Sequence, residues 1–155
     1  MSSTNTVPYE RATSGKSARD ETTKILQRLG CKRIGCMDDF EARSVLLRFD
    51  VNGRATQLEA SAMGYAKLWL KAHPYNPHYM RVTELEHRGR ALAQGAIAVN
   101  SILRDWVKGQ VTAIECGVVT LEQAFMPLMI GPDGRKVADV VLANLLPPPE
   151  ASHDD

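Results

Sequence analysis

Cysteine is scarce in this chain of 155 residues, and the number of cysteines is odd. The three thiols are Cys31, Cys36 and Cys116, and no two of them have the Cys-x-x-Cys spacing of a zinc or redox motif. An odd number also argues against a disulfide framework. We therefore expect reduced thiols and a location in the cytoplasm.

Long apolar runs are lacking as well. No stretch approaches the roughly 18 apolar residues that a membrane-spanning helix needs. The N-terminal stretch is polar and contains no apolar core, so it does not resemble a signal peptide. The sequence therefore predicts a protein without a membrane partner.

Aromatic residues make up only 6% of the chain, and the formal net charge is +1. Few aromatic rings leave little surface on which nucleic-acid bases can stack. A net charge this small does not by itself indicate a nucleic-acid partner. A local strip of basic side chains is still compatible with these totals, because steering depends on how the charge is distributed.

No catalytic motif is complete. The letters SGKS at Ser14–Ser17 resemble the end of a phosphate-binding loop, but that loop needs a glycine where Glu10 stands and a strand before it. His73, His78 and His87 lie close in sequence, without a cysteine or acidic residue that completes a metal-binding set. The sequence therefore predicts a protein without catalytic residues, metal or other cofactor.

The most specific local pattern is a β-hairpin over residues 44–61. Asn52-Gly53 is typical of a two-residue type I′ turn, because both turn positions need a positive φ. That turn sets the register. The predicted cross-strand pairs of the buried face are Val51 with Arg54, Phe49 with Thr56, Leu47 with Leu58, and Val45 with Ala60. The opposite face, which we expect to meet water or a partner, carries Leu46, Arg48, Asp50, Ala55, Gln57 and Glu59.

Helices are predicted on both sides of the hairpin. Capping boxes are expected at three starts, namely Ser17 with Asp20, Thr83 with Glu86, and Thr120 with Gln123. The predicted elements are a helix over 17–29, a first strand over 32–37, a helix over 62–73, a long helix over about 84–115, a short helix over 120–126 and a final helix over 137–146. The apolar face of the second helix is predicted to contain Met63, Ala66, Trp69 and Leu70, and that of the long helix to begin at Leu85.

This order predicts an α+β fold. We expect a small three-stranded antiparallel sheet, a meander that contains the Asn52-Gly53 hairpin, packed by helices. The expected organisation is a flexible N-terminal segment over 1–16, a single domain over 17–147, and an extended tail rich in proline and acidic residues over 148–155. The long helix carries Ala91, Ala98 and Ile102 beside its main apolar arc, which predicts a homo-oligomer.

Basic side chains supply the candidate site. On the long helix, Arg90, Arg104 and Lys108 cluster opposite the apolar arc, where they suit contacts along a phosphate backbone. The full candidate set for nucleic-acid binding is Lys32, Arg33, Arg48, Lys67, Lys71, Arg90, Arg104 and Lys108.

Several stretches resemble a group of small proteins encoded by tailed phages and prophages. They are PYERATSG near the start, GYAKLWLKAHP, SILRDWVKGQVTAIECG and the terminal LLPPPE. The resemblance covers most of residues 8–150. It implies a protein made in the host cytoplasm during infection, and it implies no particular activity.

A second resemblance concerns architecture alone. A helix, a three-stranded antiparallel meander and a following helix are similar to the core of the Rad52-like single-strand annealing proteins. That resemblance implies rings or filaments that hold single-stranded DNA against a basic groove without ATP, and no family residue is carried over from it.

The sequence leaves two classes of function open. The first is a phage-encoded, non-enzymatic, oligomeric DNA-binding protein that anneals single strands. The second is a protein-interaction module, either an inhibitor of host defence or an assembly accessory. Such an inhibitor would bind a host protein or sequester a small nucleotide.

Overall fold

The computed structural model describes residues 6–146 together with 148 and 149. Its elements in chain order are α1 (Gly15–Leu29), β1 (Ile34–Asp39), β2 (Ser44–Val51), β3 (Arg54–Ser61), α2 (Ala62–Ala72), α3 (Glu84–Glu115), α4 (Leu121–Phe125), the 3-10 turn η1 (Met126–Leu128) and α5 (Val137–Asn144). The strands form an antiparallel sheet in the order β1-β2-β3. The predicted α+β class, with a small antiparallel sheet and one long helix, is confirmed.

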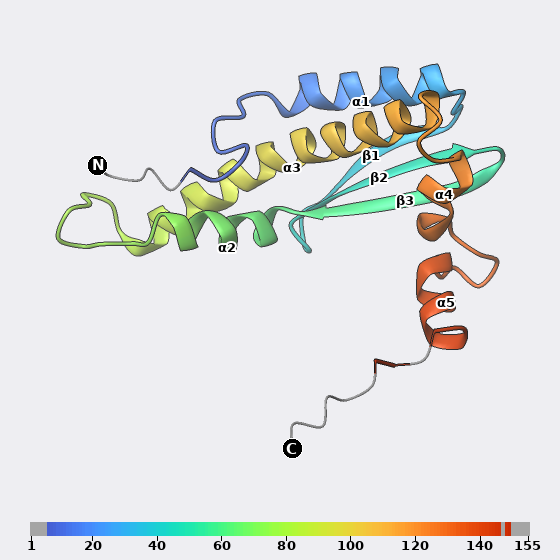
Figure 1. The fold of residues 1–155 in the computed structure, drawn as a ribbon. Helices are drawn as coiled ribbons and strands as arrows, with labels where there is room; N and C mark the ends of the chain where they lie inside the picture. Colours follow the sequence, from blue (N-terminus) through green and yellow to red (C-terminus); the bar gives the residue numbers. More distant parts are fainter. Residues whose placement is uncertain (1–5, 147, 150–155) are drawn as a thin grey trace.

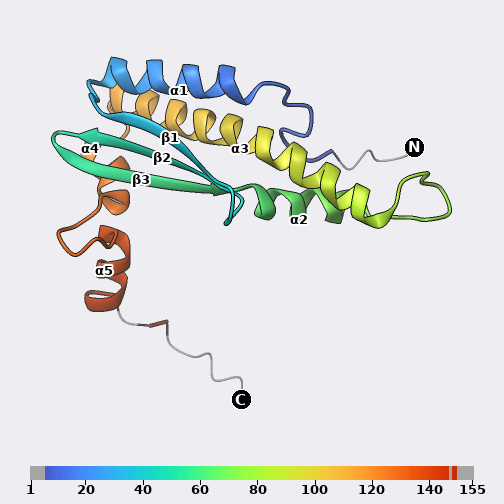
Figure 2. The ribbon, with the colours of Figure 1, turned by 180° about the vertical axis from the view of Figure 1, so that it is seen from behind.

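Two helices cover one side of this sheet. In Figure 1, α1 and α3 lie side by side along it, and α2 lies beside the part of α3 that extends past the end of the strands. Seen from behind in Figure 2, the strands have no helix in front of them. The sheet therefore has a covered inner face and an uncovered open face. Side chains on the open face are Met37, Leu46, Arg48, Asp50, Ala55, Gln57 and Glu59.

The predicted hairpin register is confirmed. Val51 pairs with Arg54 and Phe49 with Thr56, and the two remaining predicted pairs also form. Asn52 has φ 50° and Gly53 has φ 79°, as a type I′ turn requires. Because side chains alternate between the two faces, this register decides which residues of β2 and β3 stay open.

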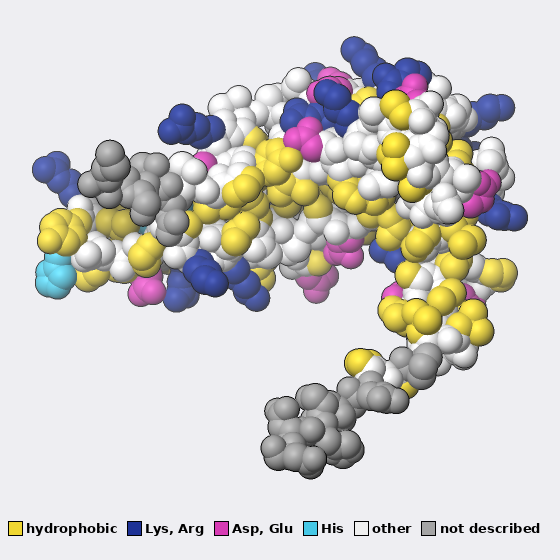
Figure 3. Space-filling view, in the orientation of Figure 1, with side chains coloured by type: hydrophobic (Ala, Val, Ile, Leu, Met, Phe, Trp, Pro, Cys, Tyr) yellow, Lys and Arg dark blue, Asp and Glu magenta, His cyan; other side chains and the backbone are white. Residues whose placement is uncertain are grey.

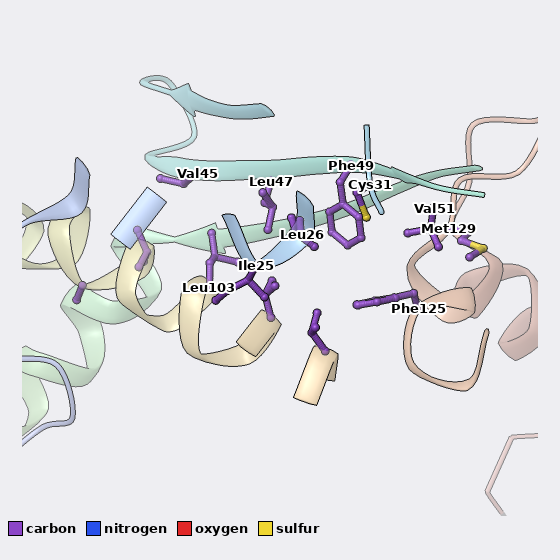
Figure 4. Close-up of a cluster of buried hydrophobic side chains, with 14 of the residues drawn as sticks. Ile25, Leu26, Cys31, Val45, Leu47, Phe49, Val51, Leu103, Phe125 and Met129 are labelled. Atoms are coloured by element: carbon purple, nitrogen blue, oxygen red, sulfur yellow. The ribbon is translucent and has the colours of Figure 1, made fainter. Parts of the chain in front are cut away.

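The core lies between the inner face of the sheet and the helices. Leu47 and Phe49 of β2 are 0% exposed, as is Leu26 of α1. Figure 4 shows these side chains gathered with Leu103 of α3 beneath the sheet. At the hairpin end, Phe125 of α4 meets Phe49 edge to face with ring centroids 5.3 Å apart. Burial of this cluster fixes α1, α3 and α4 to one side of β2.

Helix α1 begins earlier than predicted. Its N-cap is Ser14, whose Oγ accepts the N–H of Ser17 at 3.2 Å, so the predicted capping box at Ser17 and Asp20 is wrong. Ser14 and Ser17 are both able to cap the helix, and packing against α3 decides between them. Gly15 lies so close to α3 that a Cβ there would be 2.7 Å from Nδ2 of Asn100.

Strand β1 is displaced by two residues from the predicted range 32–37. Ile34 pairs with Phe49, and the strand continues to Asp39, whose carboxylate accepts the N–H groups of Glu41 and Ala42 in the following turn. The sequence indicates a strand here, but its pairing with β2 depends on long-range contacts.

Two apolar positions are also misassigned. Met63 is 45% exposed and Leu85 is 80% exposed, although periodicity places both on buried faces. The buried residues of α2 include Ala62 and Tyr65, so its contact face is rotated from the predicted stripe. Periodicity locates an apolar stripe and does not show how far the neighbouring elements extend.

Part of the segment predicted to be flexible is packed against α3. Val7 is buried, and Nε2 of Gln94 donates to the carbonyl oxygens of Tyr9 and Ala12 at 3.1 and 3.2 Å. Residues 1–5 lie outside the described residues. So does most of the predicted tail 148–155, of which only 148 and 149 are described, outside any helix or strand.

Helices α2 and α3 approach each other closely at Gly95. A Cβ on Gly95 would lie 2.5 Å from the carbonyl oxygen of Ala62, whereas a Cβ on Gly89 of the same helix would meet nothing within 4 Å. Both glycines lie on α3, but Gly95 is in tight contact with α2 and Gly89 is not.

We predict that Gly95→Ala lowers the free energy of unfolding by about 1–3 kcal/mol, because the methyl group forces the helices apart. The matched variant Gly89→Ala should raise it by up to about 1 kcal/mol, since alanine favours an exposed helix. Urea unfolding followed by circular dichroism measures both. Equal stability of Gly95→Ala and the parent would show that this close contact does not form in solution.

Candidate nucleic-acid interface

The eight basic residues predicted to bind nucleic acid occupy three separate parts of the structure. Lys32, Arg33 and Arg48 border the open face of the sheet, Lys67 and Lys71 lie on α2, and Arg90, Arg104 and Lys108 lie on α3. Lys32, Arg33 and Arg48 border one hollow.

That hollow is a groove of about 600 Å³ on the open face, bordered by Lys32, Arg33 and Arg48. Arg48 stands at its centre, between Gly35 of β1 and Gln57 of β3 in the cross-strand pairing. Because Gly35 has no side chain, β1 leaves space beside Arg48. The groove thus joins three cations, the amide of Gln57 and the carboxylate of Asp50 on an uncovered surface.

The start of β1 positions the two outer cations. The carbonyl oxygen of Arg33 accepts the N–H of Asp50 at 3.0 Å, which ties this residue to the end of β2. The guanidinium of Arg33 is 88% exposed and lies 3.7 Å from the carboxylate of Asp50. An exposed pair at this distance contributes little to stability, so the guanidinium can also contact an incoming anion. Lys32 and Arg33 line a second hollow of about 450 Å³ beside the hairpin turn.

Contacts beneath the sheet hold β1 in place. Arg19 of α1 donates through its two terminal nitrogens to the carboxylate of Asp38, and through Nε to Oδ1 of Asn100 at 2.7 Å. This network joins α1, β1 and α3. The hydrogen bond from Arg19 lowers the pKa of Asp38 from its ordinary value of 3.8, against a smaller opposing effect of burial.

On α3, acidic neighbours neutralise two of the predicted cations. Nε of Arg104 lies 2.8 Å from Oδ1 of Asp105 and 3.6 Å from the carboxylate of Glu21, and Nζ of Lys108 lies 3.9 Å from Glu21. The hydrogen bond from Arg104 is the main cause of the lowered pKa of Asp105. The strip that the sequence predicts along α3 is therefore not a free run of positive charge.

Lys67, Lys71 and Arg90 are exposed and lie away from the groove. Basic side chains gather along the lower edge of α2 in Figure 3. Within the described part of the chain, none of these three residues makes an ion pair. Lys67 and Lys71 lie one helical turn apart on α2 and form a second basic area.

The histidines serve packing and hydrogen bonding. Nε2 of His73 lies 2.9 Å from Oε2 of Glu10, and Nε2 of His87 lies 2.6 Å from the carbonyl oxygen of His73. Both rings stack near Trp69, at centroid distances of 4.6 and 5.1 Å. Among the described residues there is no group of three or more metal-ligating side chains.

Sequence reasoning missed the part played by Gly35. Its place beside Arg48 depends on the pairing of β1 with β2, and no local pattern fixes that register. The hairpin turn does place Gln57 opposite Arg48, so this half of the groove was open to prediction.

Comparisons with known proteins do not identify a function for the site. No protein-family model matches the chain, no curated protein matches it, and no solved structure matches its fold. Among the described residues, no helix is both long and apolar enough to cross a membrane. The groove must therefore be interpreted from its own residues.

The ion pair beneath β1 gives a pH-dependent prediction. In the folded protein Arg19 favours the charged form of Asp38, so the stabilisation is present above pH 3.8 and is lost as the pH falls through the lower folded pKa. We expect Asp38→Asn to lower the free energy of unfolding at pH 7 by about 0.5–1 kcal/mol, because the pair is partly exposed. In urea titrations, this difference from the parent should shrink below pH 3.8.

The matched control is Glu41→Gln, in the exposed turn that follows β1. It should leave stability almost unchanged at either pH. An Asp38→Asn effect that is the same at pH 7 and at low pH would contradict the assigned role of the charge.

Proposed function

We propose that the protein binds single-stranded nucleic acid through the open face of its sheet. One observation carries the proposal: Lys32, Arg33 and Arg48 border a groove that no helix covers. Phosphate contacts from such cations supply binding that is independent of sequence and sensitive to salt. The groove presents no constellation of catalytic groups, which suits a binding role.

The floor of the groove suits a flexible single strand. Met37 is 65% exposed and Leu46 is half-buried, and both lie next to Arg48 on the open face. They offer apolar surface to unstacked bases, while the amide of Gln57 offers a donor and an acceptor. Without an aromatic ring on this face, binding should show little base preference.

The biological form of this activity that we propose is ATP-independent annealing by an oligomer made during phage infection. Support comes from the order α1-β1-β2-β3-α2, the helix–meander–helix order expected of an annealing core. An annealing protein must hold one strand with its bases accessible to a second strand. An open sheet with cations along its border meets that requirement.

Fluorescence anisotropy with a labelled single-stranded oligonucleotide tests the proposal. We expect binding at low salt that weakens as salt is raised, and a large loss of affinity in the double variant Lys32→Ala/Arg48→Ala. If each cation contacts one phosphate, the slope of log K against log salt should fall by about 1.4 for the two contacts.

The matched control is Lys67→Ala/Lys71→Ala, which removes the same number of charges from α2. It should retain most of the affinity and of the salt dependence. No binding by the parent at low salt would refute the proposal. An equal loss in both double variants would move the contact away from the sheet.

The sequence argument for an oligomer needs revision. Ala91 and Ala98 are 0% exposed within a single chain, and Ile102 is half-buried, so these residues do not call for a second subunit. Instead, α5 presents unpartnered apolar surface. It has no buried residue, although its sequence is VADVVLAN. Leu142 of α5 and Leu145, which follows the helix as its C-cap, are 60% and 73% exposed.

Figure 3 shows hydrophobic side chains over α5, which projects from the body in Figure 1. Apolar surface of this kind marks protein contacts. A second copy of the chain is the partner that we propose, because strand annealing requires several nucleic-acid sites in one assembly.

Light scattering tests this contact. We expect the parent to form an oligomer, and Leu142→Glu/Leu145→Glu to have the mass of one chain, because buried carboxylates oppose the contact. Ala143→Glu, on the same helix, is the control for added charge and should change the mass less. A monomeric parent would contradict the proposed oligomer and favour the alternative, in which α5 binds a host protein.

A further inference from the structure

We propose a second binding site, for the phosphate group of a small ligand, at the N-terminus of α1. A hollow of about 500 Å³ lies there between residues 6–14 and α3, with Arg11, Ser14, Ser17, Ser101 and Arg104 among its lining residues. Its volume suits a ligand of the size of a mononucleotide. It is separate from the groove on the open face and does not depend on the function proposed for that groove.

The segment above the hollow is held at two points of α3. Gln94 donates to the carbonyl oxygens of Tyr9 and Ala12. Further along α3, Asp105 accepts a hydrogen bond from the hydroxyl of Tyr9 at 2.7 Å. Ser101 lies between Gln94 and Asp105 on the same side of the helix, at intervals of seven and four residues. These hydrogen bonds hold the segment that covers the hollow in place against α3.

Ser101 gives the clearest sign of a ligand. It is 5% exposed and lines the hollow, yet its hydroxyl has no hydrogen-bond partner within residues 6–146. Polar atoms of residues this buried usually have a partner in the protein, in an ordered water or in a ligand. The hydroxyl is not sealed in the core, unlike the unpartnered Oγ1 of Thr56, so it opens onto the hollow and can donate to an anion there.

The N-terminus of α1 supplies further donors. Ser14 satisfies the N–H groups of Ser17 and Ala18, but those of Gly15 and Lys16 have no acceptor in the described part of the chain. Free amides at the positive end of a 15-residue helix are favourable for a phosphate group. The SGKS letters therefore mark a helix N-terminus beside a hollow, without the preceding strand of a phosphate-binding loop.

The charges around the hollow are mixed, and Arg104 is already paired with acidic neighbours, so what it can still offer an anion is its terminal nitrogens. Arg104 uses Nε for Asp105 and Glu21, and its two terminal nitrogens have no partner among the described residues. Arg11 adds a second cation. The acidic lining residue, Glu10, is already held by His73 at 2.9 Å and by the N–H of Val7 at 3.1 Å.

Titration of the ¹⁵N-labelled protein with inorganic phosphate, and separately with adenosine 5′-monophosphate, tests the site against chloride at matched ionic strength. We expect the amide signals of Gly15 and Lys16 to shift with both probes and not with chloride. Ser101→Ala should weaken binding about tenfold, the usual loss of a hydrogen bond to a charged group. Arg11→Ala should also weaken phosphate binding. Because Arg11 is exposed, this variant still tests the site if Ser101→Ala fails to fold.

Two matched controls separate this site from other effects. Thr56→Val also removes a buried, unpartnered hydroxyl but lies outside the hollow, so phosphate binding should be unchanged. Lys32→Ala/Arg48→Ala should greatly weaken nucleic-acid binding at the sheet and leave the phosphate shifts intact. Shifts at the open face alone, shifts equal to those caused by chloride, or full affinity in both Ser101→Ala and Arg11→Ala would overturn the proposal.

Discussion

Four side chains of β2 point into the molecule, namely Val45, Leu47, Phe49 and Val51, and none of them is more than 4% exposed. Burying them is the main gain of the fold, because apolar area removed from water is the largest favourable contribution to folding. The helices α1, α3 and α4 are all needed on one side of the sheet to cover this strand. The other side is left open as a direct consequence, and a groove with three cations lies there.

The division of charge follows from the same arrangement. Where α1 and α3 pack together, their basic residues face acidic residues of the neighbouring helix, as Arg104 and Lys108 face Glu21. On the open face no second element approaches, and Arg48 makes no ion pair within residues 6–146. A cation is available to a ligand where no other element packs against it. The periodicity of a single helix does not show which of its cations will be covered in this way.

Local features were predictable from the sequence and long-range ones were not. The turn Asn52-Gly53 fixed the hairpin register because the required backbone angles belong to those two residues. The capping boxes at Thr83 and Thr120 formed as predicted, since each needs only residues within one turn. The start of α1, by contrast, depends on a contact with Asn100, more than eighty residues away.

The candidate sites divide in the same way. The sequence named all three cations of the groove, but it did not separate them from five others, because only the pairing of β1 with β2 brings Lys32 and Arg33 beside Arg48. The hollow beside α1 could not be predicted from the sequence. It requires residues 6–14 to lie against α3, and the hydrogen bonds from Gln94 that hold them have no local signature.

The tight contact at Gly15 connects the start of α1 with the edge of the sheet. Gly15 rests against the amide of Asn100, Asn100 accepts a hydrogen bond from Arg19, and Arg19 holds the carboxylate of Asp38. Asp38 follows Met37, which lies on the open face. Three side chains thus connect the first turn of α1, through α3, to the edge strand β1. Because Asn100 both limits the space at Gly15 and accepts the hydrogen bond of Arg19, the position of that helix end and the position of that strand are set by one shared constraint.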